Sequence, residues 1–463
     1  MKRFIPFLVL LYCISAKAQI NIDSVIQSQM TQKRIAAVSA LIVKKGEPVW
    51  FKAYGKANVA QDINATTNMS FMLASISKTI TATALMQVWE NGGFDLDDNI
   101  NDYLSFDVIN PNFSSNAITF RHLLTHTSGI TDDWNTLGSL YVYGDSPISL
   151  NDFCSGYLAT GGAYYAPTNY SNNAPGTNYE YSNVGATLCG YLVESITGIN
   201  FNQYCKDSIF TPLCMDNTAW FISELDVNNV VLPHYYEDGQ YFSEDHYGYP
   251  DYPDGQLRTN ATSLGRFLNM YMNYGVHNGT RILDSATVAT MLTEQVPTLE
   301  DGQGLMWYSG TQSGKTWWGH NGGDLGVTTD MRFFPADSIG IVLLTNCDEA
   351  NYIPMLNQIV NFAQGLTPNT NNYPCGELLD NEEYVYVPSA LLNAYPNPAN
   401  SFLNLETDKS FANTVVDVYD VTGKNVKQYT NINGSQVQLS IADLAPGLYT
   451  IRWNNSHLRF IKD

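Results

Sequence analysis

One short segment constrains this chain more than any other: a Ser-x-x-Lys sequence, Ser75 to Lys78, at the start of a predicted helix. Apolar residues follow at helical spacing from Ile80 to Trp89, and Gly92-Gly93 ends the run, so the helix is predicted to begin close to the serine. Residues three apart share a helix face, which places Lys78 beside the Ser75 hydroxyl. The pattern predicts a serine nucleophile at a helix N-terminus and a desolvated lysine that loses its own proton and accepts the serine's. The same residues also fit a capping serine followed by a surface lysine.

Composition limits the classes of protein that remain. The chain has 463 residues, of which 44% are hydrophobic and 13% aromatic, so it can form a large domain and a smaller one with real cores. The net charge of -21 argues against a nucleic-acid partner. We expect the acidity to serve solubility.

The N-terminus predicts export. Residues 1–18 combine Lys2-Arg3, an apolar run over residues 4–14 and Ala16-Lys17-Ala18, which together read as a secretory signal peptide cleaved after Ala18. No later stretch approaches the roughly twenty apolar residues of a membrane helix, so no stable transmembrane segment is expected.

Six cysteines follow the predicted signal peptide: Cys154, Cys189, Cys205, Cys214, Cys347 and Cys375. An even count in an exported chain permits disulfides, whose pairing the sequence leaves open. Cys189 lies in an apolar helical run and is predicted to be a small buried residue. Because the chain contains no Cys-x-x-Cys pair, a cysteine-based zinc site is not expected.

Further segments add strands and polar groups. Residues 35–54 predict a β-hairpin around Lys44 to Glu47, and residues 328–334 and 339–345 predict two more strands. The segment 253–264 is predicted to start a helix that continues through Tyr271. The Tyr, Asn, Ser and Gly-rich segment 137–175 predicts an irregular insertion that forms part of a cleft wall.

Three polar groupings could carry chemistry. Two histidines four apart, His122 and His126, sit on a predicted helix, but the general-base glutamate of a zinc protease is missing, so structural roles are expected. In Tyr181-Ser182-Asn183, one turn can present a phenol as proton carrier and an amide as donor to the substrate. Tyr-x-Asn is also a common turn sequence, and this chain contains thirty tyrosines, so the spacing alone proves nothing. In His320-Asn321-Gly322-Gly323, a glycine-flanked strand lets a ligand approach, with the Gly323 N–H as an oxyanion donor beside that of Ser75. A β-bulge with a packed histidine is the alternative interpretation of this last segment.

Taken together and in this order, Ser75-Ile76-Ser77-Lys78, Tyr181-Ser182-Asn183 and His320-Asn321-Gly322 resemble the serine β-lactamase and penicillin-binding-protein superfamily, especially class C β-lactamases and related D-alanyl-D-alanine carboxypeptidases, D-aminopeptidases and esterases. The resemblance covers about residues 35–361. It implies an α+β fold, in which an antiparallel sheet is flanked by helices and a helical subdomain bears Ser75. It also implies that no metal or organic cofactor is needed.

The resemblance further implies roles for these residues. Ser75 would attack an amide or ester carbonyl and form an acyl-enzyme, while Lys78 and Tyr181 share the proton transfers, and which of the two is the base stays open. Asn183 would hold the substrate's amide, and the N–H groups of Ser75 and Gly323 would bind the oxyanion. Class C β-lactamases carry Lys-Thr-Gly at the third motif, whereas this chain has His320-Asn321-Gly322, which replaces a permanent cation with a group that titrates near neutrality. We therefore expect activity to fall as His320 protonates, and peptidase or esterase activity rather than efficient β-lactam hydrolysis.

The composition changes after residue 361. Residues 365–372 are rich in Gly, Thr, Pro and Asn and predict a linker, and short strands recur from residue 391 onward, which predicts a small β-sandwich. Its Tyr395-Pro396-Asn397-Pro398 sequence, its Leu444 to Tyr449 segment and its basic end resemble the C-terminal sorting domain of the type IX secretion system. That resemblance implies export across the outer membrane. An ordinary carbohydrate- or protein-binding sandwich is the alternative.

The predicted organisation is a signal peptide (1–18), a serine hydrolase domain (19–364), a linker (365–390) and a sorting domain (391–463). The predicted function is an exported serine hydrolase acting on a small-molecule or peptide substrate, with the type IX machinery as partner. Its predicted location is extracellular or at the cell surface, with the periplasm as alternative. A non-catalytic, penicillin-binding sensor of the same fold is the rival hypothesis. The substrate stays open among stem peptides, D-amino-acid peptides, esters and β-lactams.

Overall fold

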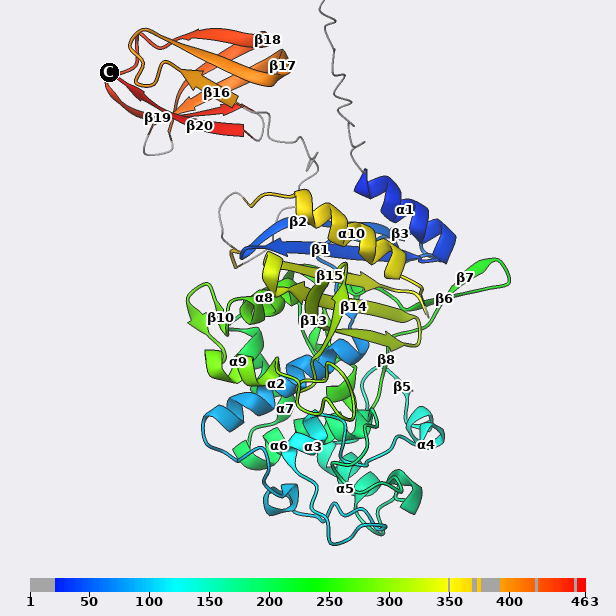
Figure 1. The fold of residues 1–463 in the computed structure, drawn as a ribbon. Coiled ribbons are helices and arrows are strands. Elements are labelled where there is room, and N and C mark those ends of the chain that lie inside the picture. The colour runs from blue at the N-terminus through cyan, green and yellow to red at the C-terminus, as the bar shows by residue number, and fades with distance from the viewer. Residues whose placement is uncertain (1–20, 349, 369–372, 376–391, 421–423, 454–455) are drawn as a thin grey trace, which may run out of the picture. The chain divides into compact units, whose positions relative to one another are not determined.

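The computed structural model describes residues 21–348, 350–368, 373–375, 392–420, 424–453 and 456–463, and the chain divides into two compact units, residues 1–381 and 382–463 (Figure 1). The predicted signal peptide and most of the predicted linker lie outside the described residues, and the predicted boundaries stay predictions. The α-helices are α1 (Ile22–Lys33), α2 (Ser77–Glu90), α3 (Phe120–Leu124), α4 (Trp134–Ser139), α5 (Leu150–Leu158), α6 (Asn183–Thr197), α7 (Phe201–Cys205), α8 (Ala261–Met272), α9 (Ser285–Met291) and α10 (Ile353–Gly365).

Seven strands of the first unit form an antiparallel sheet in the order β12-β13-β14-β15-β1-β2-β3. Its members are β1 (Ala37–Lys44), β2 (Glu47–Asn58), β3 (Ile63–Asn64), β12 (Tyr308–Gln312), β13 (Lys315–Asp324), β14 (Val327–Phe334) and β15 (Ile339–Thr345). Short pairs complete the unit: β4 (Phe71–Met72) with β9 (Arg258–Thr259), β5 (Val142–Tyr143) with β8 (Tyr247–Gly248), β6 (His234–Glu237) with β7 (Gln240–Ser243), and β10 (Val276–His277) with β11 (Thr280–Arg281).

Helices cover both faces of this sheet. Every residue of β14 and β15 is buried, which a sheet with one solvated face does not allow. Helices α1 and α10 pack together on one face, and α8 packs on the other against β1 and β15 (Figure 1). The predicted hairpin and the two later strands are confirmed, with Leu41 of β1 paired to both Phe51 and Val342.

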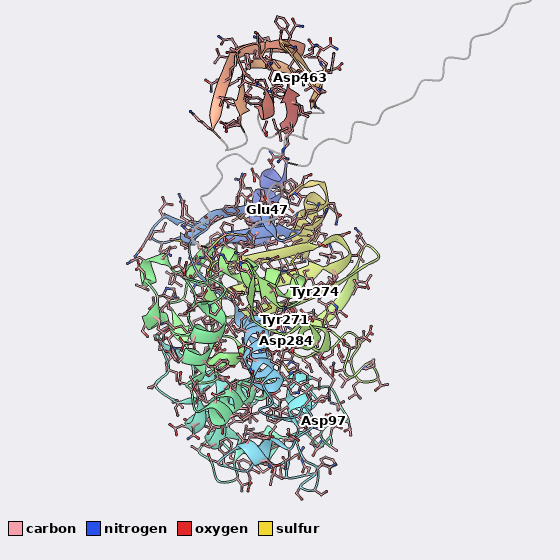
Figure 2. The ribbon with its side chains drawn as sticks, turned by 90° about the vertical axis from the view of Figure 1, so that its left-hand side faces the viewer. Glu47, Asp97, Tyr271, Tyr274, Asp284 and Asp463 are labelled. Carbon is pink, nitrogen blue, oxygen red and sulfur yellow. A yellow bond between two sulfur atoms is a disulfide. The ribbon has the colours of Figure 1, made fainter. Side chains whose placement is uncertain are left out.

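A helical region lies on the α8 side of the sheet (Figure 1). Its central helix α2 is buried on all sides from Ser77 to Val88, as expected of a helix enclosed by others, and it packs against α6. In Figure 2, Glu47 marks the sheet end of this unit and Asp97 the helical end. The predicted helix through Tyr271 is confirmed as α8, but it begins only at Ala261, after a 3-10 turn at Tyr252–Asp254 and the strand β9. The Tyr271 hydroxyl hydrogen-bonds to Thr83 of α2 at 2.7 Å, which joins the two layers.

Two local predictions need correction. The segment 137–175 is not wholly irregular, because Ser149 caps α5 through the Asp152 amide at 3.1 Å and apolar side chains of α5 pack into the core. His126 does not share a helix with His122, since α3 ends at Leu124 and His126 has a φ of 56°.

The second unit is strand-rich, as predicted, and its strands form one nearly closed sheet. They are β16 (Leu392–Tyr395), β17 (Phe402–Tyr419), β18 (Asn425–Ser440), β19 (Gly447–Trp453) and β20 (Ser456–Lys462). The long β17 pairs with β16 and β18 and, near its end, with β19, while β16 lies against β20. Predicted separate strands at 402–405 and 415–419 are one strand here, because register shifts let β17 bend without ending. The predicted turn at Thr422-Gly423 lies outside the described residues.

The structure pairs two of the six cysteines that follow the predicted signal peptide. Cys214 and Cys375 form a disulfide that closes 161 residues of the first unit. Cys189 is fully buried, as predicted. Among the described helices, none is both long and apolar enough to cross a membrane.

Candidate active site

Ser75 lies on a tight turn at the start of the central helix. It is the middle residue of the 3-10 turn η1 (Ala74–Ile76), which leads directly into α2, so the predicted position of the serine is confirmed. Ala74 has a φ of 50°, a left-handed conformation that costs a residue with a side chain on the order of 1 kcal/mol. The turn is held from two sides, since Thr329 of β14 donates to the Leu73 carbonyl at 2.6 Å and the Leu73 amide donates to Leu257 at 2.8 Å. Hydrogen bonds to residues distant in the chain therefore hold the strained turn that carries Ser75.

Strand β13 approaches this turn so closely that one position must be glycine. A Cβ on Gly322 would lie 2.3 Å from the Leu73 oxygen, 2.5 Å from Thr329 Oγ1 and 3.0 Å from Ala74 Cβ. A Cβ on Gly323 would meet no atom within 4 Å, which leaves the backbone of that residue open to the cleft. The predicted glycine-flanked strand therefore lies against the serine turn, and this close approach is possible because Gly322 has no side chain.

Replacing Gly322 with Ala should lower the rate of Ser75 acylation by about 10²-fold, because the new methyl group pushes β13 away from η1 and a displacement of about 1 Å costs that much. The second-order rate of labelling by a fluorophosphonate measures the effect. Gly138→Ala is the matched control, since its Cβ would meet nothing within 4 Å and α4 favours alanine. Equal rates for the two variants would contradict the steric argument.

Lys78 is fully buried and forms the centre of a polar network. Its Nζ lies 3.1 Å from Ser75 Oγ, 2.6 Å from Asn183 Oδ1 and 2.8 Å from the Asp254 carbonyl oxygen. The Asp254 carboxylate is 3.4 Å away, and the Tyr181 ring centroid is 5.0 Å away. The structure therefore brings together Ser75, Lys78, Tyr181 and Asn183 as predicted, and adds Asp254.

The predicted loss of the lysine proton needs correction. Burial by itself lowers the pKa of Lys78, but Tyr181, Asp254 and Asp132 outweigh it, so the pKa lies above the ordinary 10.5. Burial raises the pKa of Asp254 to about 7 against the opposing effect of Lys78. The sequence indicated that Lys78 would be desolvated, which lowers its pKa. It gave no sign of the Asp254 carboxylate, which lies 176 residues further along the chain and raises that pKa.

Asp254 should make the stability of the first unit depend on pH. Its folded pKa of about 7 exceeds the ordinary 3.8, so between these values the folded chain binds more protons than the unfolded chain, and stability falls as pH rises. Asp254→Asn removes this titration. The histidines are present in both wild type and variant, so their contribution to the pH dependence cancels in the difference between the two proteins. The free energy of unfolding of the variant, measured relative to that of wild type, should rise by more than about 1.4 kcal/mol between pH 4.5 and 7.5. That figure is the free energy that corresponds to one pKa unit. Urea unfolding followed by tryptophan fluorescence tests this, and parallel curves would contradict it.

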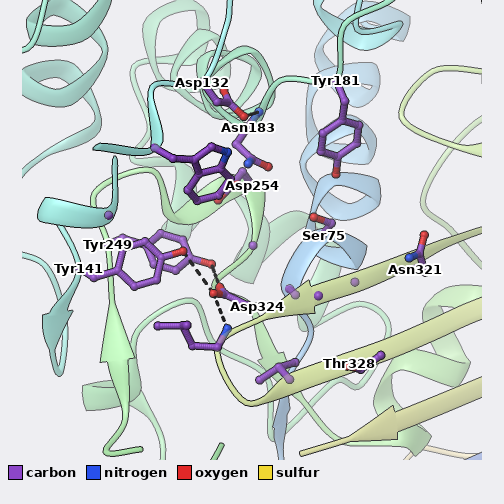
Figure 3. A pocket seen from close by; sticks show the side chains of 18 of the residues that line it. Ser75, Asp132, Tyr141, Tyr181, Asn183, Tyr249, Asp254, Asn321, Asp324 and Thr328 are labelled. Atoms are coloured by element: carbon purple, nitrogen blue, oxygen red, sulfur yellow. Dashed lines mark hydrogen bonds between the residues drawn. The ribbon is translucent and has the colours of Figure 1, made fainter. Parts of the chain in front are cut away.

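Tyr181 and Asn183 lie at the entrance of α6. Ser182 caps the helix by accepting from the Gly185 amide at 2.9 Å, and Asp132 accepts from the Asn183 amide at 2.8 Å and the Val184 amide at 3.1 Å. This double cap fixes the turn that carries both predicted side chains. Tyr181 is 38% exposed, and Figure 3 shows its hydroxyl directed toward Ser75.

The third predicted segment lies on β13, but its histidine is not a neutral-pH switch. His320 is buried, and burial together with Lys78 lowers its pKa to about 3. Its Nδ1 contacts the Asn321 carbonyl oxygen at 2.6 Å, and its ring centroid lies 6.3 Å from that of Tyr181. Asn321 is held by Tyr308, whose hydroxyl accepts from the Asn321 amide at 3.0 Å. The expectation that His320 titrates near neutrality is therefore wrong, because its cavity disfavours the charged form.

The two other histidines named in the sequence analysis, His122 and His126, accept hydrogen bonds from backbone amides. His122 Nδ1 accepts from the Thr119 amide at 3.2 Å in a capping box, and His126 Nδ1 accepts from the Ser182 amide at 3.2 Å. His126 thereby supports the Tyr181 turn. Within the part of the chain that the structure describes, no group of three or more His, Cys, Asp or Glu side chains is arranged to hold a metal.

A cleft opens in front of Ser75 and has two arms. The larger arm has a volume of about 1030 Å³ and the smaller about 460 Å³, and Ser75, Tyr181, Asn321 and Gly323 line both. Figure 3 shows Ser75, Tyr181 and Asn321 in the larger arm. Gly138 and Tyr141 come from the predicted insertion and line the larger arm.

Sequence reasoning missed four polar residues here, which are Asp132, Asp254, Tyr308 and Asp324. Asp254 lies in the segment 253–264, which the sequence predicts only as the start of a helix, and Asp132 and Tyr308 stand in unremarkable loop and strand sequences. No local pattern marks them, because Asp132, Asp254 and Asp324 contact residues between 51 and 176 positions away and Tyr308 contacts Asn321 on the next strand.

A serine on a strained turn at the start of a buried helix, an antiparallel sheet whose strand β13 lies against that turn, and a lysine three residues on define a β-lactamase/transpeptidase-like fold. Residues 22–359 match the family described as Beta-lactamase, and the chain belongs to that family. Penicillin-binding protein 4 of Amycolatopsis lactamdurans is 27% identical over 309 residues, which are 64% of this chain and 76% of that protein. Protein flp of Staphylococcus aureus (strain MRSA252) is 27% identical over 203 residues, 44% of this chain and 38% of that relative, so the match spans about two fifths of its length.

Solved structures share the fold. A D-amino acid amidase from Ochrobactrum anthropi SV3, complexed with D-phenylalanine, aligns with a TM-score of 0.60 at 20% identity, over 74% of this chain and 99% of that one. Residues 393–463 match the family described as Secretion system C-terminal sorting domain. The protein is therefore a secreted or cell-surface protein.

Proposed function

We propose that this protein is an exported serine hydrolase that cleaves an amide or ester through an acyl-enzyme on Ser75. The observation that carries the proposal is the contact of Lys78 Nζ with both Ser75 Oγ at 3.1 Å and Asn183 Oδ1 at 2.6 Å at the junction of the two cleft arms. A buried ammonium in this position stabilises negative charge as the serine oxygen attacks.

The proton transfers follow from the charge of Lys78. An ammonium cannot accept the serine proton, so Tyr181 takes it while its own proton passes to the leaving nitrogen or oxygen. The N–H groups of Ser75 and Gly323 bind the oxyanion. Asn183 has its amide oxygen on Lys78, so its N–H donors serve the substrate's amide. Water then releases the acyl group. His320 stays neutral and, with Asn321 and Gly322, shapes the strand that faces the substrate.

The C-terminal unit supports export through the type IX secretion machinery, which would recognise the sorting domain. On this proposal, the substrate is met outside the cell or at its surface. Penicillin-binding and amide-hydrolysing relatives of the same fold support an acyl-transfer reaction and leave D-alanyl-D-alanine carboxypeptidase activity as one of its candidate forms.

The test is the intact mass of the purified protein after exposure to a fluorophosphonate and, separately, to benzylpenicillin. Wild type should gain one fluorophosphonate adduct per chain, and Ser75→Ala should gain none. Slow decay of a penicillin adduct would favour a peptidase, and rapid turnover of penicillin a β-lactamase. A wild type that gains no adduct from either reagent would refute the proposal in favour of a non-catalytic binding protein.

A further inference from the structure

The cleft in front of Ser75 is lined by many acidic side chains and few basic ones. Among the described residues that line its larger arm there are five carboxylates and no Lys, Arg or His; the carboxylates are Asp132, Glu180, Asp254, Asp324 and Asp348. The smaller arm adds Glu300 and Asp301 beside two buried histidines. Lys78 is buried behind Ser75 and already bonded to Asn183 and Asp254. A cleft lined by one sign of charge concentrates ligands of the opposite sign.

Asp324 is the best-placed of these carboxylates to meet a ligand. It accepts from the Tyr141 hydroxyl at 3.2 Å and from the Leu325 amide at 2.8 Å through Oδ1, and from the Tyr249 hydroxyl at 3.1 Å through Oδ2 (Figure 3). The Tyr141 and Tyr249 rings lie 4.7 Å apart between centroids. Trp134, which is 59% exposed, lines the same arm. A carboxylate held among aromatic rings offers both hydrogen-bond acceptors and ring faces to a cation.

This group lies close to the nucleophile. Tyr249 packs in one apolar cluster with Ala74, the residue before Ser75. A Cβ on Gly255 would lie 2.4 Å from the Tyr249 hydroxyl and 3.8 Å from the Ala74 carbonyl carbon, so glycine is required where the tyrosine meets the serine turn. Ser75 and Asp324 both line the larger arm, so a substrate whose carbonyl carbon reaches Ser75 from this arm brings its neighbouring atoms toward Asp324.

A second observation points to a missing donor. Asp254 lines the same arm and is 7% exposed, and its Oδ1 is buried with no hydrogen-bond partner among the described residues. A buried carboxylate oxygen without a donor is costly. A ligand rich in N–H donors would satisfy it.

We propose that the larger arm, around Asp324, Tyr141 and Tyr249, is a subsite for a protonated amine of the substrate. The inference rests on the proposed function and names its substrate class. An ammonium brings three donors and a positive charge to the acidic wall, and it contacts the tyrosine rings. A carboxylate near the scissile bond meets like charge instead, so acidic substrates are disfavoured.

The test compares three p-nitroanilides, each as both enantiomers: alanine (cationic), N-acetylalanine (neutral) and N-succinylalanine (anionic). In the full-length protein, kcat/KM for the cationic compound should exceed that for the neutral one by about tenfold or more, and the anionic compound should be poorest. Asp324→Asn should bring the cationic-to-neutral ratio toward one. Glu300→Gln removes the same charge from the other arm and should keep the ratio.

A second measurement needs no variant. Butylammonium chloride should slow fluorophosphonate labelling of wild type, whereas 1-butanol at equal concentration should not. Equal effects of the two, an unchanged ratio in Asp324→Asn, or a preference for the succinyl compound would each overturn the subsite. Absence of any adduct from both the fluorophosphonate and benzylpenicillin would instead refute the proposed function, so the two failures are distinguishable.

Discussion

Replacing Ser75 with Ala should reduce turnover of p-nitrophenyl acetate by about 10⁴-fold or more, because no other group at this position can carry the acyl intermediate. The Ser75 side chain faces the cleft, and its hydrogen bond is to Lys78 at 3.1 Å, so its loss leaves the core packing intact. Steady-state kinetics and far-ultraviolet circular dichroism together measure the effect.

Ser77→Ala is the matched control. Ser77 lies two residues further on and is buried, and its hydroxyl accepts from the Leu257 amide at 3.2 Å. This variant should lose about 1 kcal/mol of stability through the lost bond and still turn over substrate. Retained turnover in Ser75→Ala, with an unchanged spectrum, would contradict the nucleophile assignment.

Replacing Lys78 with Met should lower the acylation rate on the order of 10³-fold and also destabilise the first unit. The rate falls because the ammonium that contacts Ser75 Oγ is gone. Stability falls by about 3 kcal/mol because the buried Asp254 carboxylate and the Asn183 amide oxygen lose their shared donor. Fluorophosphonate labelling rates and urea unfolding measure the two effects separately.

The double variant Lys78→Met/Asp254→Asn separates chemistry from structure. Removing both charges takes away the unpaired carboxylate, so part of the lost stability should return. The labelling rate should stay low, because the ammonium is still absent. Recovery of the rate along with the stability would show that Lys78 acts only as a structural counter-ion.

Local patterns in the sequence were enough to locate the elements that carry the site. The strand alternation at residues 35–54 and the helical spacing after Ser75 reflect the side-chain periods of 2 and 3.6 residues, which depend on neighbours in the chain. The hairpin β1-β2, the helix α2 and the strands β14 and β15 formed as predicted for that reason. In the second unit, short strands merged into β17, because a bulge interrupts a sequence pattern without ending a strand.

The contact between Ser75 and Lys78 was itself predictable, since it spans three residues of one helical turn. The order of the three polar motifs was enough to identify the family, whose pattern covers residues 22–359. The steric need for Gly322 was not predictable, because it arises where β13 meets a turn about 250 residues earlier in the chain.

The charges at the site were decided by tertiary structure alone. Lys78 meets Asn183 and Asp254 across 105 and 176 residues of chain, and these partners raise its pKa where burial alone would lower it. Burial and the same ammonium hold His320 neutral. A pKa reports desolvation and nearby charge, and both depend on which distant residues fold around the group. The sequence by itself determined which residues stand on which helix or strand, and the tertiary structure determined their protonation and the acidity of the cleft.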